Sequence, residues 1–524
     1  MLEAITQDKG AFNVYHTSKY RRFFLLALVS IFAGFSACSP ATNNITPALT
    51  ATSSKVPADT FPDARDCLRL NQHAQATFTN VRVSHDAYLA HSEPMLAENP
   101  KNPLNLVGGS KFFIDPAHYI FQIGYFTSFD GGCTWSDGGL LPGFEKNVTT
   151  SDISFAFGNH NNVYAAVLYA GKGTQGKSGI AVSTSTDGGK TFGNPVSVFE
   201  DRADQVFSDK PWIAVDQTDR SRSGSIYVVW SYDHNGTCGG YNNCSEELAF
   251  SRSTDGGKTF SPVSLVEGNA PFCTNPATGR PSGSTRCDAV QGAIPVVGPD
   301  GTLYVASPYI DLMNGHIPTR LLVTTSPDGG NTWTAPVLIA TIHDILGWFP
   351  PEKYRNLSLP AFACDSRTGQ LYLTWSDKGT RDADILFTIS KDHGLTWTAP
   401  IRVNDDAQGN GANQFQPQMA VAPDGVVSIS FFDTRLDPRH LFIDVYLAQS
   451  VDHGASFMKN VRVTTRSWDP AVNAPVDSYG SQFIGDYQGL AADNHSVHPF
   501  WNDTRTGAQE IFAAAVPSAQ PRVP

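Results

Sequence analysis

One eight-residue pattern occurs six times along this chain, and its recurrence constrains the fold more strongly than any other feature of the sequence. The first copy is SFDGGCTW at 128–135, with a Ser, an Asp two residues later, a Gly two residues after the Asp, and an aromatic residue at the eighth position. The other copies are STDGGKTF (185–192), STDGGKTF (253–260), SPDGGNTW (326–333), SKDHGLTW (390–397) and SVDHGASF (450–457). The Asp residues of successive copies are 57, 68, 73, 64 and 60 positions apart. This spacing indicates a repeated supersecondary unit.

The residue types of the octet suit a tight turn. Ser and Asp side chains can accept hydrogen bonds from backbone N–H groups, Gly adopts the positive φ that a hairpin requires, and the aromatic residue can pack on the sheet. A calcium loop would need further oxygen ligands at alternating positions and a distal Glu. Lys190, Thr191 and Lys258 stand where such ligands would be needed. We therefore predict turns and not metal loops.

Segments typical of β-strands surround each octet in the same order. In the third unit they are PWIAVD (211–216), SIYVVW (225–230) and ELAFSRS (247–253), followed after the octet by PVSLV (262–266). No sustained helical period appears after position 60, so the pattern favours an all-β protein. A four-stranded antiparallel meander repeated at this spacing is a propeller blade.

The number of blades follows from the two ends of the repeat region. Units with an octet begin near 92, 150, 208, 288, 356 and 413, and three more strand-like segments follow at 486–516 without an octet. The segment NVRVS at 80–84 resembles the fourth strands PIRVN and NVRVT. We therefore predict a seven-bladed propeller over 63–517, whose N-terminal strand completes the last blade and leaves no free edge. A six-bladed ring with an appended hairpin is the alternative.

The first residues have the pattern of a targeting segment. Lys19, Arg21 and Arg22 precede an apolar stretch at 23–35, and small residues then lead to Cys38. The end of this segment resembles a bacterial lipobox, which makes Cys38 the expected lipidation site and 1–38 the expected signal peptide. An ordinary signal peptide cleaved nearby is the alternative. Residues 39–62 are rich in Ser, Thr, Pro and Ala and are predicted to be a flexible linker. The protein is thus expected to be exported and lipid-anchored in a bacterium.

Export permits disulfide bonds, since these persist outside the cytosol. We predict two local bridges, each between cysteines that flank one loop, and a less strongly supported third bridge. Cys364 lies in the apolar segment LPAFACD and is expected to be a buried free thiol. No Cys and His spacing matches a zinc site, so neither a metal nor a cofactor is predicted. The predicted bridges are Cys238–Cys244, Cys273–Cys287 and, third, Cys67–Cys133.

The charge of the chain excludes one class of partner. The net charge is −12, and the Lys and Arg residues are scattered along the sequence. No basic stripe is present that could neutralise a phosphate backbone. Nucleic acid is therefore not an expected partner, a membrane is expected only through the lipid anchor, and the protein is expected to be a monomer.

The octets resemble the Asp boxes, or BNR repeats, of the sialidase superfamily, and the resemblance covers residues 80–516. It implies a propeller in which the octets lie on the face away from the functional site. Sialidases begin their first blade with Phe-Arg-Ile-Pro, whose Arg clamps the substrate carboxylate. Here His91, Ser92 and Glu93 precede Pro94, so that arginine is absent and Glu93 would repel a carboxylate. The segment DYQGLA resembles the start of the sialidase nucleophile strand and puts Tyr487 at the nucleophile position.

The predicted site lies where the first strand of each blade begins, close to the central axis. Clustered carboxylates there could raise the pKa of one another and supply an acid and a base. The alternative is that they solvate a water-filled channel. The polar candidates at these positions are Glu93, Asp152, Asp209, Lys210, Gln416, Asp486 and Tyr487. Of these, Glu93, Asp209, Asp486 and Tyr487 are the predicted catalytic residues.

Substrate-binding residues are predicted at the strand starts and in loops of the same face. Lys210, Trp348 and the arginines of two DTR segments, Arg435 and Arg505, are the candidates. The two arginines could equally pair with the preceding Asp and hold strand ends together, and Trp348 could pack within its own loop. The sequence thus supports two hypotheses: a sialidase-like propeller that hydrolyses a glycan, and a non-catalytic surface module that binds a glycan or glycoprotein.

Overall fold

The structure is a computed structural model that describes residues 78–520, with short gaps. The gaps are 145–147, 172–175, 203–205, 235–236, 239–240, 243–245, 267, 274–284, 286, 288–289, 310–318, 346–353, 380–381 and 478–479. The predicted signal peptide, Cys38, the linker and the predicted start of the propeller at 63 lie outside the described residues. Within them, no helix is long and apolar enough to cross a membrane.

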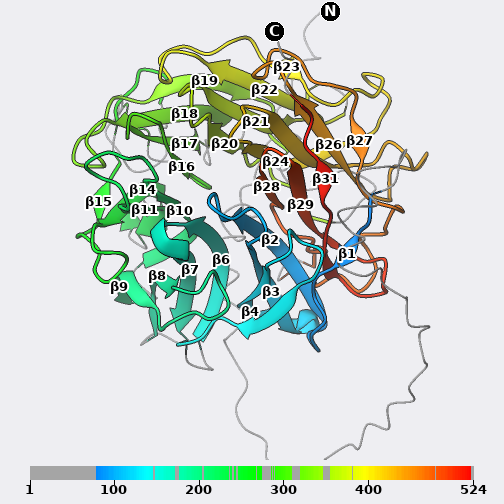
Figure 1. The fold of residues 1–524 in the computed structure, drawn as a ribbon, viewed down its shortest axis with the longest axis horizontal. Helices are drawn as coiled ribbons and strands as arrows, with labels where there is room; N and C mark the ends of the chain where they lie inside the picture. Colours follow the sequence, from blue (N-terminus) through cyan, green and yellow to red (C-terminus); the bar gives the residue numbers. More distant parts are fainter. Residues whose placement is uncertain are drawn as a thin grey trace, which may run out of the picture.

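The described strands form seven antiparallel blades arranged in a ring (Figure 1). Blade 1 comprises β2 (Ala90–Glu98), β3 (Leu106–Asp115), β4 (Ile120–Ser128) and β5 (Ser136–Leu140). Blade 2 comprises β6 (Val148–Phe157), β7 (Val163–Gly171), β8 (Lys177–Ser185) and β9 (Val196–Arg202). Blade 3 comprises β10 (Val206–Val215), β11 (Ile226–His234), β14 (Glu246–Ser253) and β15 (Ser264–Leu265). Blade 4 comprises β16 (Ile294–Val297), β17 (Leu303–Tyr309), β18 (Thr319–Ser326) and β19 (Val337–Ile342).

The remaining blades follow the same order of strands. Blade 5 comprises β20 (Ala361–Cys364), β21 (Leu371–Asp377), β22 (Asp384–Ser390) and β23 (Ile401–Arg402), and blade 6 comprises β24 (Gln414–Val421), β25 (Val427–Asp433), β26 (Asp444–Ser450) and β27 (Val461–Arg462). Blade 7 contains β28 (Gly489–Ala492), β29 (Ser496–Asp503) and β30 (Glu510–Ala513). A two-stranded hairpin, β12 (Thr237–Cys238) with β13 (Tyr241–Asn242), and two 3-10 turns, η1 (Pro116–His118) and η2 (Asn159–Asn161), are the other described elements inside the ring region.

The seventh blade is closed by the N-terminal strand, as the sequence predicts. Strand β1 (Val81–Arg82) pairs with β30 in the register Val81↔Ala513, and a short strand β31 (Val516–Pro517) also pairs with β29. Val83 then packs, fully buried, in a cluster shared by blades 7 and 1. The six-bladed alternative is therefore wrong. The closing strand covers the edge of β30, which would otherwise expose unpaired backbone groups.

The octets are the turns between the third and fourth strands of blades 1–6. In the first copy, Gly132 N–H donates to Ser128 Oγ and Thr134 N–H donates to Asp130 Oδ1, both at 2.9 Å. Gly131 and Gly132 have φ values of 73° and 83°, and Trp135 packs 5.4 Å from Phe500 of the neighbouring blade. The predicted turn chemistry is confirmed.

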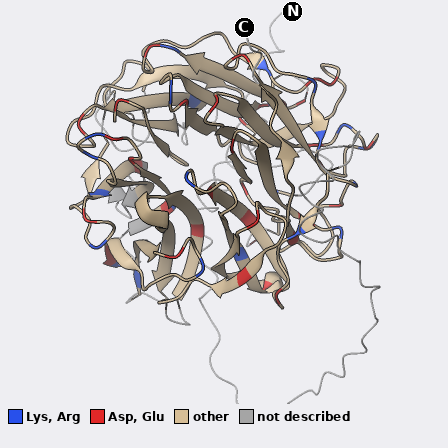
Figure 2. Ribbon diagram, in the orientation of Figure 1, with Lys and Arg blue, Asp and Glu red and all other residues tan. Residues whose placement is uncertain are grey.

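The apolar core is divided into clusters between neighbouring blades. Strand residues alternate between two flat faces, and each face packs on the next blade, so each sheet is buried on both sides and reads as a nearly continuous apolar run. Trp230, Trp375 and Trp501 are fully buried in three of these clusters, where they pack between blades. Charged residues of both signs are distributed around the ring (Figure 2).

The described cysteines confirm one predicted bridge and the predicted free thiol, but not the full burial of that thiol. Cys273 and Cys287 form a disulfide with a Cα–Cα distance of 5.1 Å. Cys133 is disulfide-bonded, and its predicted partner Cys67 lies outside the described residues. Cys364 is a free thiol and is partly buried, not fully buried as predicted. The predicted Cys238–Cys244 bridge also falls outside the residues whose side chains are described.

Candidate functional site

The first strands of four blades begin with the same irregularity. Glu93, Asp152, Lys210 and Gln416 have φ values of 54°, 52°, 46° and 49°, in the left-handed region that such residues rarely adopt. Each lies at a break in the register with the second strand of its blade. A bulge of this kind re-aims a side chain and is over-represented next to active sites. Here it brings polar side chains together at the central axis, on the face opposite the octets.

Glu93 is held by a lysine of the adjacent strand. Lys111 Nζ lies 2.5 Å from Glu93 Oε2, and the Glu93 side chain is 1% exposed. The Lys111 ammonium also lies 4.7 Å from the centre of the Phe121 ring and 5.0 Å from that of Phe483. A buried ammonium is stable only when paired in this way. Lys111 and Glu93 therefore form a buried pair at one side of the site, which is an ion pair when Glu93 is ionised.

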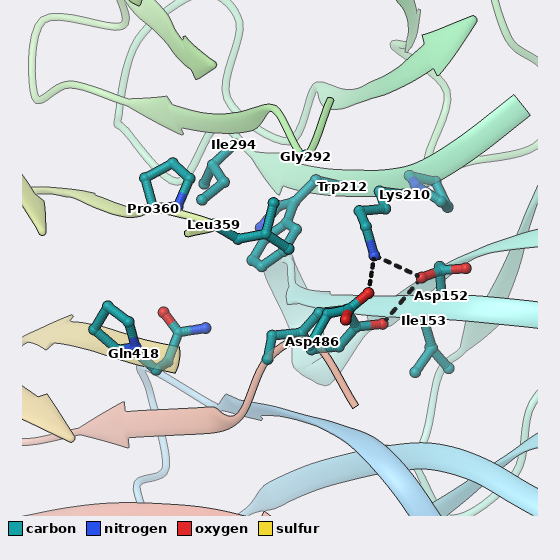
Figure 3. A pocket seen from close by; sticks show the side chains of 13 residues that line it. Asp152, Ile153, Lys210, Trp212, Gly292, Ile294, Leu359, Pro360, Gln418 and Asp486 are labelled. Carbon is teal, nitrogen blue, oxygen red and sulfur yellow. Dashed lines mark hydrogen bonds and ion pairs between the residues drawn. The ribbon is translucent and has the colours of Figure 1, made fainter. Parts of the chain in front are cut away.

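Asp486 is the centre of a second group of charges. The Arg355 guanidinium binds it with two parallel hydrogen bonds, Nε to Oδ1 at 3.0 Å and Nη2 to Oδ2 at 2.7 Å. Lys210 Nζ lies 3.1 Å from Asp486 Oδ2 and 3.6 Å from Asp152 Oδ1 (Figure 3). The two carboxylates thus share one ammonium group, although Asp486 is 276 residues from Lys210 in the chain.

The Tyr487 hydroxyl completes this group. It donates to Asp152 Oδ1 at 3.4 Å, while Ser151 Oγ donates to Asp152 Oδ2 at 2.5 Å. The edge of the Tyr487 ring meets Trp212 at a centroid distance of 6.4 Å. Asp152 therefore accepts from two hydroxyl groups and is oriented toward the phenol.

Burial and charge divide these acids into two classes. Burial raises the pKa of Glu93 to about 7, with Asp152 and Asp486 adding to the rise that Lys111 opposes. Burial and the charge of Asp152 raise the pKa of Asp209 to about 6, and its Oδ2 accepts from Gln291 at 3.0 Å. Glu93 therefore gains and loses its proton close to neutral pH, and Asp209 does so about one pH unit lower.

The other two carboxyl groups and the phenol behave differently. Burial acts to raise the pKa of Asp152, but the charges of Lys111 and Lys210 outweigh it and the pKa falls below its usual range. Burial is likewise outweighed at Asp486, where Arg355 and Lys210 hold the pKa far below normal. Burial and the surrounding carboxylates raise the pKa of Tyr487 well above its usual value. At neutral pH Asp152 and Asp486 are thus ionised and the phenol of Tyr487 is neutral.

A recess opens beside this group of residues. The space between the atoms that line it is about 470 Å³, including the part open to solvent. Asp152, Lys210 and Asp486 line one side (Figure 3), and Tyr487, whose hydroxyl donates to Asp152, also lines the recess. The other lining residues are mostly apolar: Ile153, Pro211, Trp212, Gly292, Ile294, Leu359, Pro360, Pro417 and Gln418. The recess therefore offers an apolar wall facing a charged, hydrogen-bonding wall.

The structure gathers the predicted catalytic residues in one place and adds two that the sequence analysis missed. Glu93, Asp209, Asp486, Tyr487 and Lys210 all act electrostatically on one another around the central axis. Lys111 and Arg355 were not predicted. A lysine inside the apolar strand LVGGSKFFID is a usable signal, because charged residues are almost never fully buried unless paired. For Arg355, the sequence contains no comparable indication of a site residue apart from its position in a long loop.

The arginines of the two DTR segments contact residues at the strand ends of the ring and not the charged residues of the site. Arg435 pairs with Asp433 at 2.7 Å and Asp405 at 2.5 Å, and Arg505 pairs with Asp503 at 2.5 Å and Asn80 at 2.8 Å. In both segments the Asp also caps the turn by accepting from the arginine backbone N–H. These contacts agree with the structural alternative and supply no free clamp for a substrate. Trp348 lies outside the described residues.

Comparisons with known proteins give fold-level likenesses. No protein-family model matches the chain, and no curated protein matches it. Among solved structures it is similar to a protein of unknown function from Dyadobacter fermentans, with 14% identity, a TM-score of 0.46, and coverage of 72% of this chain and 96% of that one. It is similar to the Hadza microbial sialidase Hz136 with 15% identity, a TM-score of 0.40, and coverage of 80% and 75%. It is also similar to a PL25 ulvan lyase with 13% identity, a TM-score of 0.42, and coverage of 68% and 78%.

Proposed function

We propose that the recess binds a neutral saccharide and that the protein hydrolyses a glycosidic bond with Tyr487 as nucleophile and Asp152 as its base. The observation that supports this most directly is the hydrogen bond from the Tyr487 hydroxyl to the Asp152 carboxylate, in the wall of the recess. A general base must lie within hydrogen-bond reach of the proton it removes, and its carboxylate must be ionised at the working pH. Asp152 meets both conditions.

The proposed reaction has two steps. Tyr487 Oη attacks the anomeric carbon and gives its proton to Asp152, while the glycosidic bond breaks and the leaving oxygen takes a proton from Asp209. Water, deprotonated by the Asp209 carboxylate, then releases the sugar from the tyrosine, and Asp152 returns the proton to the phenol. Asp209 is proposed as the acid because its raised pKa of about 6 keeps it protonated in mildly acidic solution and its side chain is less enclosed than that of Glu93.

The charges of the site favour a neutral sugar over a sialic acid. Lys111 is paired with Glu93, and Lys210 and Arg355 are paired with Asp486. Within the described part of the cluster, each cation thus already contacts the carboxyl group of an acidic side chain, and a substrate carboxylate would have to displace one. Trp212 and the prolines of the recess instead suit the apolar face of a sugar ring.

A panel of fluorogenic glycosides tested on the full-length protein would examine this proposal. With Tyr487→Phe we expect turnover to fall about 1000-fold or more while binding of the unreacted sugar persists. Asp152→Asn should have a similar effect, since the amide cannot accept the phenolic proton. Tyr304→Phe is the matched control, because its hydroxyl contacts His393 of an octet on the opposite face. Unchanged turnover in Tyr487→Phe would contradict the proposal.

A second candidate, a non-catalytic glycan-binding module, is favoured by one specific observation. The cations and carboxylates of the site neutralise one another, so the cluster could serve only to plug the channel beneath a binding surface. Glycan-array binding that survives both substitutions, with no turnover of any glycoside by the unaltered protein, would support this candidate.

We further propose that the protein is exported and anchored through a lipid on Cys38. The support is the pattern of Lys19, Arg21 and Arg22 followed by an apolar stretch and Cys38. In a bacterial host the unaltered protein should partition into a detergent phase, and Cys38→Ala should shift it to the aqueous phase. Aqueous partitioning of both forms would contradict lipidation.

A further inference from the structure

A second cluster of side chains that could bind a metal ion lies between the first and last blades. It lies at the other end of the strands from the recess. Glu98 is the last residue of β2 in blade 1, Asp493 follows β28 in blade 7, and His498 belongs to β29. His498 Nε2 lies 3.8 Å from Glu98 Oε2 and 4.0 Å from Asp493 Oδ2, and all three ligand atoms fall within 4.8 Å of one another. The first strands of blades 1 and 7 begin near the recess and end on the opposite face of the ring. The cluster lies at these ends, so it lies on the face that carries the octets.

The polar atoms of the cluster lack partners within the described part of the chain. The His498 side chain is 3% exposed, and neither ring nitrogen has a hydrogen-bond partner there. Glu98 Oε2 is also buried without a hydrogen bond, in a side chain that is 9% exposed. Buried polar groups are nearly always satisfied, and leaving one unpaired costs free energy. Two of these unpaired atoms, His498 Nε2 and Glu98 Oε2, face each other at 3.8 Å beside Asp493 Oδ2, which indicates a site for something bound between them.

The surroundings hold these side chains in place. Asp493 Oδ1 accepts from the backbone N–H of His495 at 2.5 Å and of Ser496 at 3.0 Å, which leaves Oδ2 directed at His498. Gly132 of the first octet covers the other side of the ring, since a Cβ there would lie 3.7 Å from His498 Nδ1. The charged group that acts on Glu98 is Asp493, a second carboxylate. Two carboxyl groups close to one histidine repel each other when both are ionised, and a cation bound between them would remove this repulsion.

We propose that Glu98, Asp493 and His498 bind a divalent transition-metal ion, most simply Zn²⁺, which fastens blade 1 to blade 7. A point equidistant from three atoms at these separations lies at most about 2.5 Å from each, and small side-chain shifts reach the 2.0–2.2 Å of Zn–N and Zn–O bonds. One imidazole with two carboxylates suits Zn²⁺ and its first-row neighbours, whereas Ca²⁺ and Mg²⁺ take oxygen ligands. Three protein ligands leave a position for water. The ion would strengthen the same closure that β1 makes by strand pairing.

The direct test is metal analysis and diffraction on the full-length protein. After chelation and dialysis against Zn²⁺, we expect one equivalent per chain that resists washing, and an anomalous peak at the zinc edge between the three side chains. Zn²⁺ should also raise the midpoint of thermal unfolding, because it binds the folded ring and not the separated strands. A peak elsewhere, or no retained zinc, would overturn the proposal.

Variants separate a true site from binding at surface histidines. Glu98→Gln keeps the shape of the side chain and removes the charge, and His498→Gln removes the nitrogen ligand; each should weaken Zn²⁺ binding about 100-fold or more. His343→Gln is the control, since that histidine is 69% exposed and pairs only with Asp377 among the described residues. Equal Zn²⁺ affinity in Glu98→Gln and the unaltered protein would also overturn the assignment, and Glu98→Gln supplies this test even if His498→Gln does not fold. Sugar binding at the recess should not respond to metal removal in any form.

Discussion

At the scale of single residues, the left-handed backbone at the starts of the first strands is strained, and it directs polar side chains into the site. The positive φ value of each of these residues costs free energy, which contacts with the surrounding sheet must offset. The residues are Glu93, Asp152, Lys210 and Gln416. Gln416 illustrates how this is done, because its Nε2 donates to Gly485 O at 2.6 Å while Gln488 Nε2 donates to Gln416 O at 3.0 Å. The bulges bring carboxylates close enough to shift the pKa of one another.

The raised pKa of Asp209 predicts how stability depends on pH. The folded pKa is about 6 against an ordinary value of 3.8, so between these values the folded state binds more protons than the unfolded state. Stability contributed by the protonated carboxyl is therefore present at low pH and is lost as the pH rises through about 6, with a total on the order of 3 kcal/mol. Glu93, with a folded pKa of about 7, acts in the same direction.

Unfolding in denaturant at pH 4 and pH 8 would measure most of this effect. Asp209→Asn should reduce the loss of stability between the two pH values, because the amide is neutral at both and can still meet Gln291. Asp219→Asn, at an exposed position of blade 3, is the control and should leave the difference unchanged. An undiminished loss in Asp209→Asn would show that the carboxyl is not buried as the structure has it.

At the scale of elements, the octet is a turn stabilised by one acidic side chain. Asp255 accepts from Thr259 Oγ1 at 2.6 Å and from the backbone N–H groups of Lys258 and Thr259 at 3.0 Å each. The hydroxyl of Thr259 and the other donors lower the pKa of Asp255 to about 2. In the fifth and sixth octets, His393 and His453 take the left-handed position that Gly occupies elsewhere, with φ of 61° and 56°. The turn therefore depends more on the Ser and Asp than on that first Gly.

Removing the acid should destabilise a blade without changing the recess. Asp255→Ala loses these hydrogen bonds at a solvent-exposed turn, and we expect the free energy of unfolding to fall by about 1 kcal/mol. Asp255→Asn retains an acceptor oxygen, so its free energy of unfolding should fall by less. Ligand binding at the recess, measured on the same two proteins, should be unchanged because the octets lie on the opposite face. A loss of binding in Asp255→Ala would contradict this separation of turn and site.

At the scale of the whole molecule, closure of the ring depends on contacts between the two ends of the described chain. Arg82 pairs with Glu510 at 2.8 Å, and Ser84 Oγ accepts from the backbone N–H of Ile511 at 2.9 Å. Val83 between them is fully buried against blade 7 and blade 1. These few residues hold the seam and cover an edge that would otherwise pair with another chain.

Val83→Asp should open this seam. A charge at a fully buried position without a partner should cost about 4 kcal/mol or more of stability, and the uncovered edge of β30 should promote association. Thermal unfolding and light scattering after size exclusion would measure both. Val461→Asp is the matched control, because Val461 begins the fourth strand of blade 6 and is 38% exposed. A monomeric Val83→Asp protein of normal stability would show that β1 is dispensable.

The architecture could be predicted from the sequence because it rests on local and repeated features. The Ser and Asp of each octet, such as Ser128 and Asp130, satisfy backbone groups within four residues, so the turn is encoded where it forms. The likeness of 80–84 to other fourth strands was sufficient to predict seven blades and their closure. The starts of the first strands also predicted where polar residues would gather.

What only the tertiary structure decided is which charges meet across the ring. Arg355 reaches Asp486 over 131 residues of chain, and Lys111 meets Glu93 across a strand pair that reads as apolar. Glu98 and His498 lie at opposite ends of the repeat region and become neighbours only because seven blades, and not six, close the circle. Repetition fixes each blade locally, whereas the contents of the site and the seam follow from the curvature and closure of the whole ring.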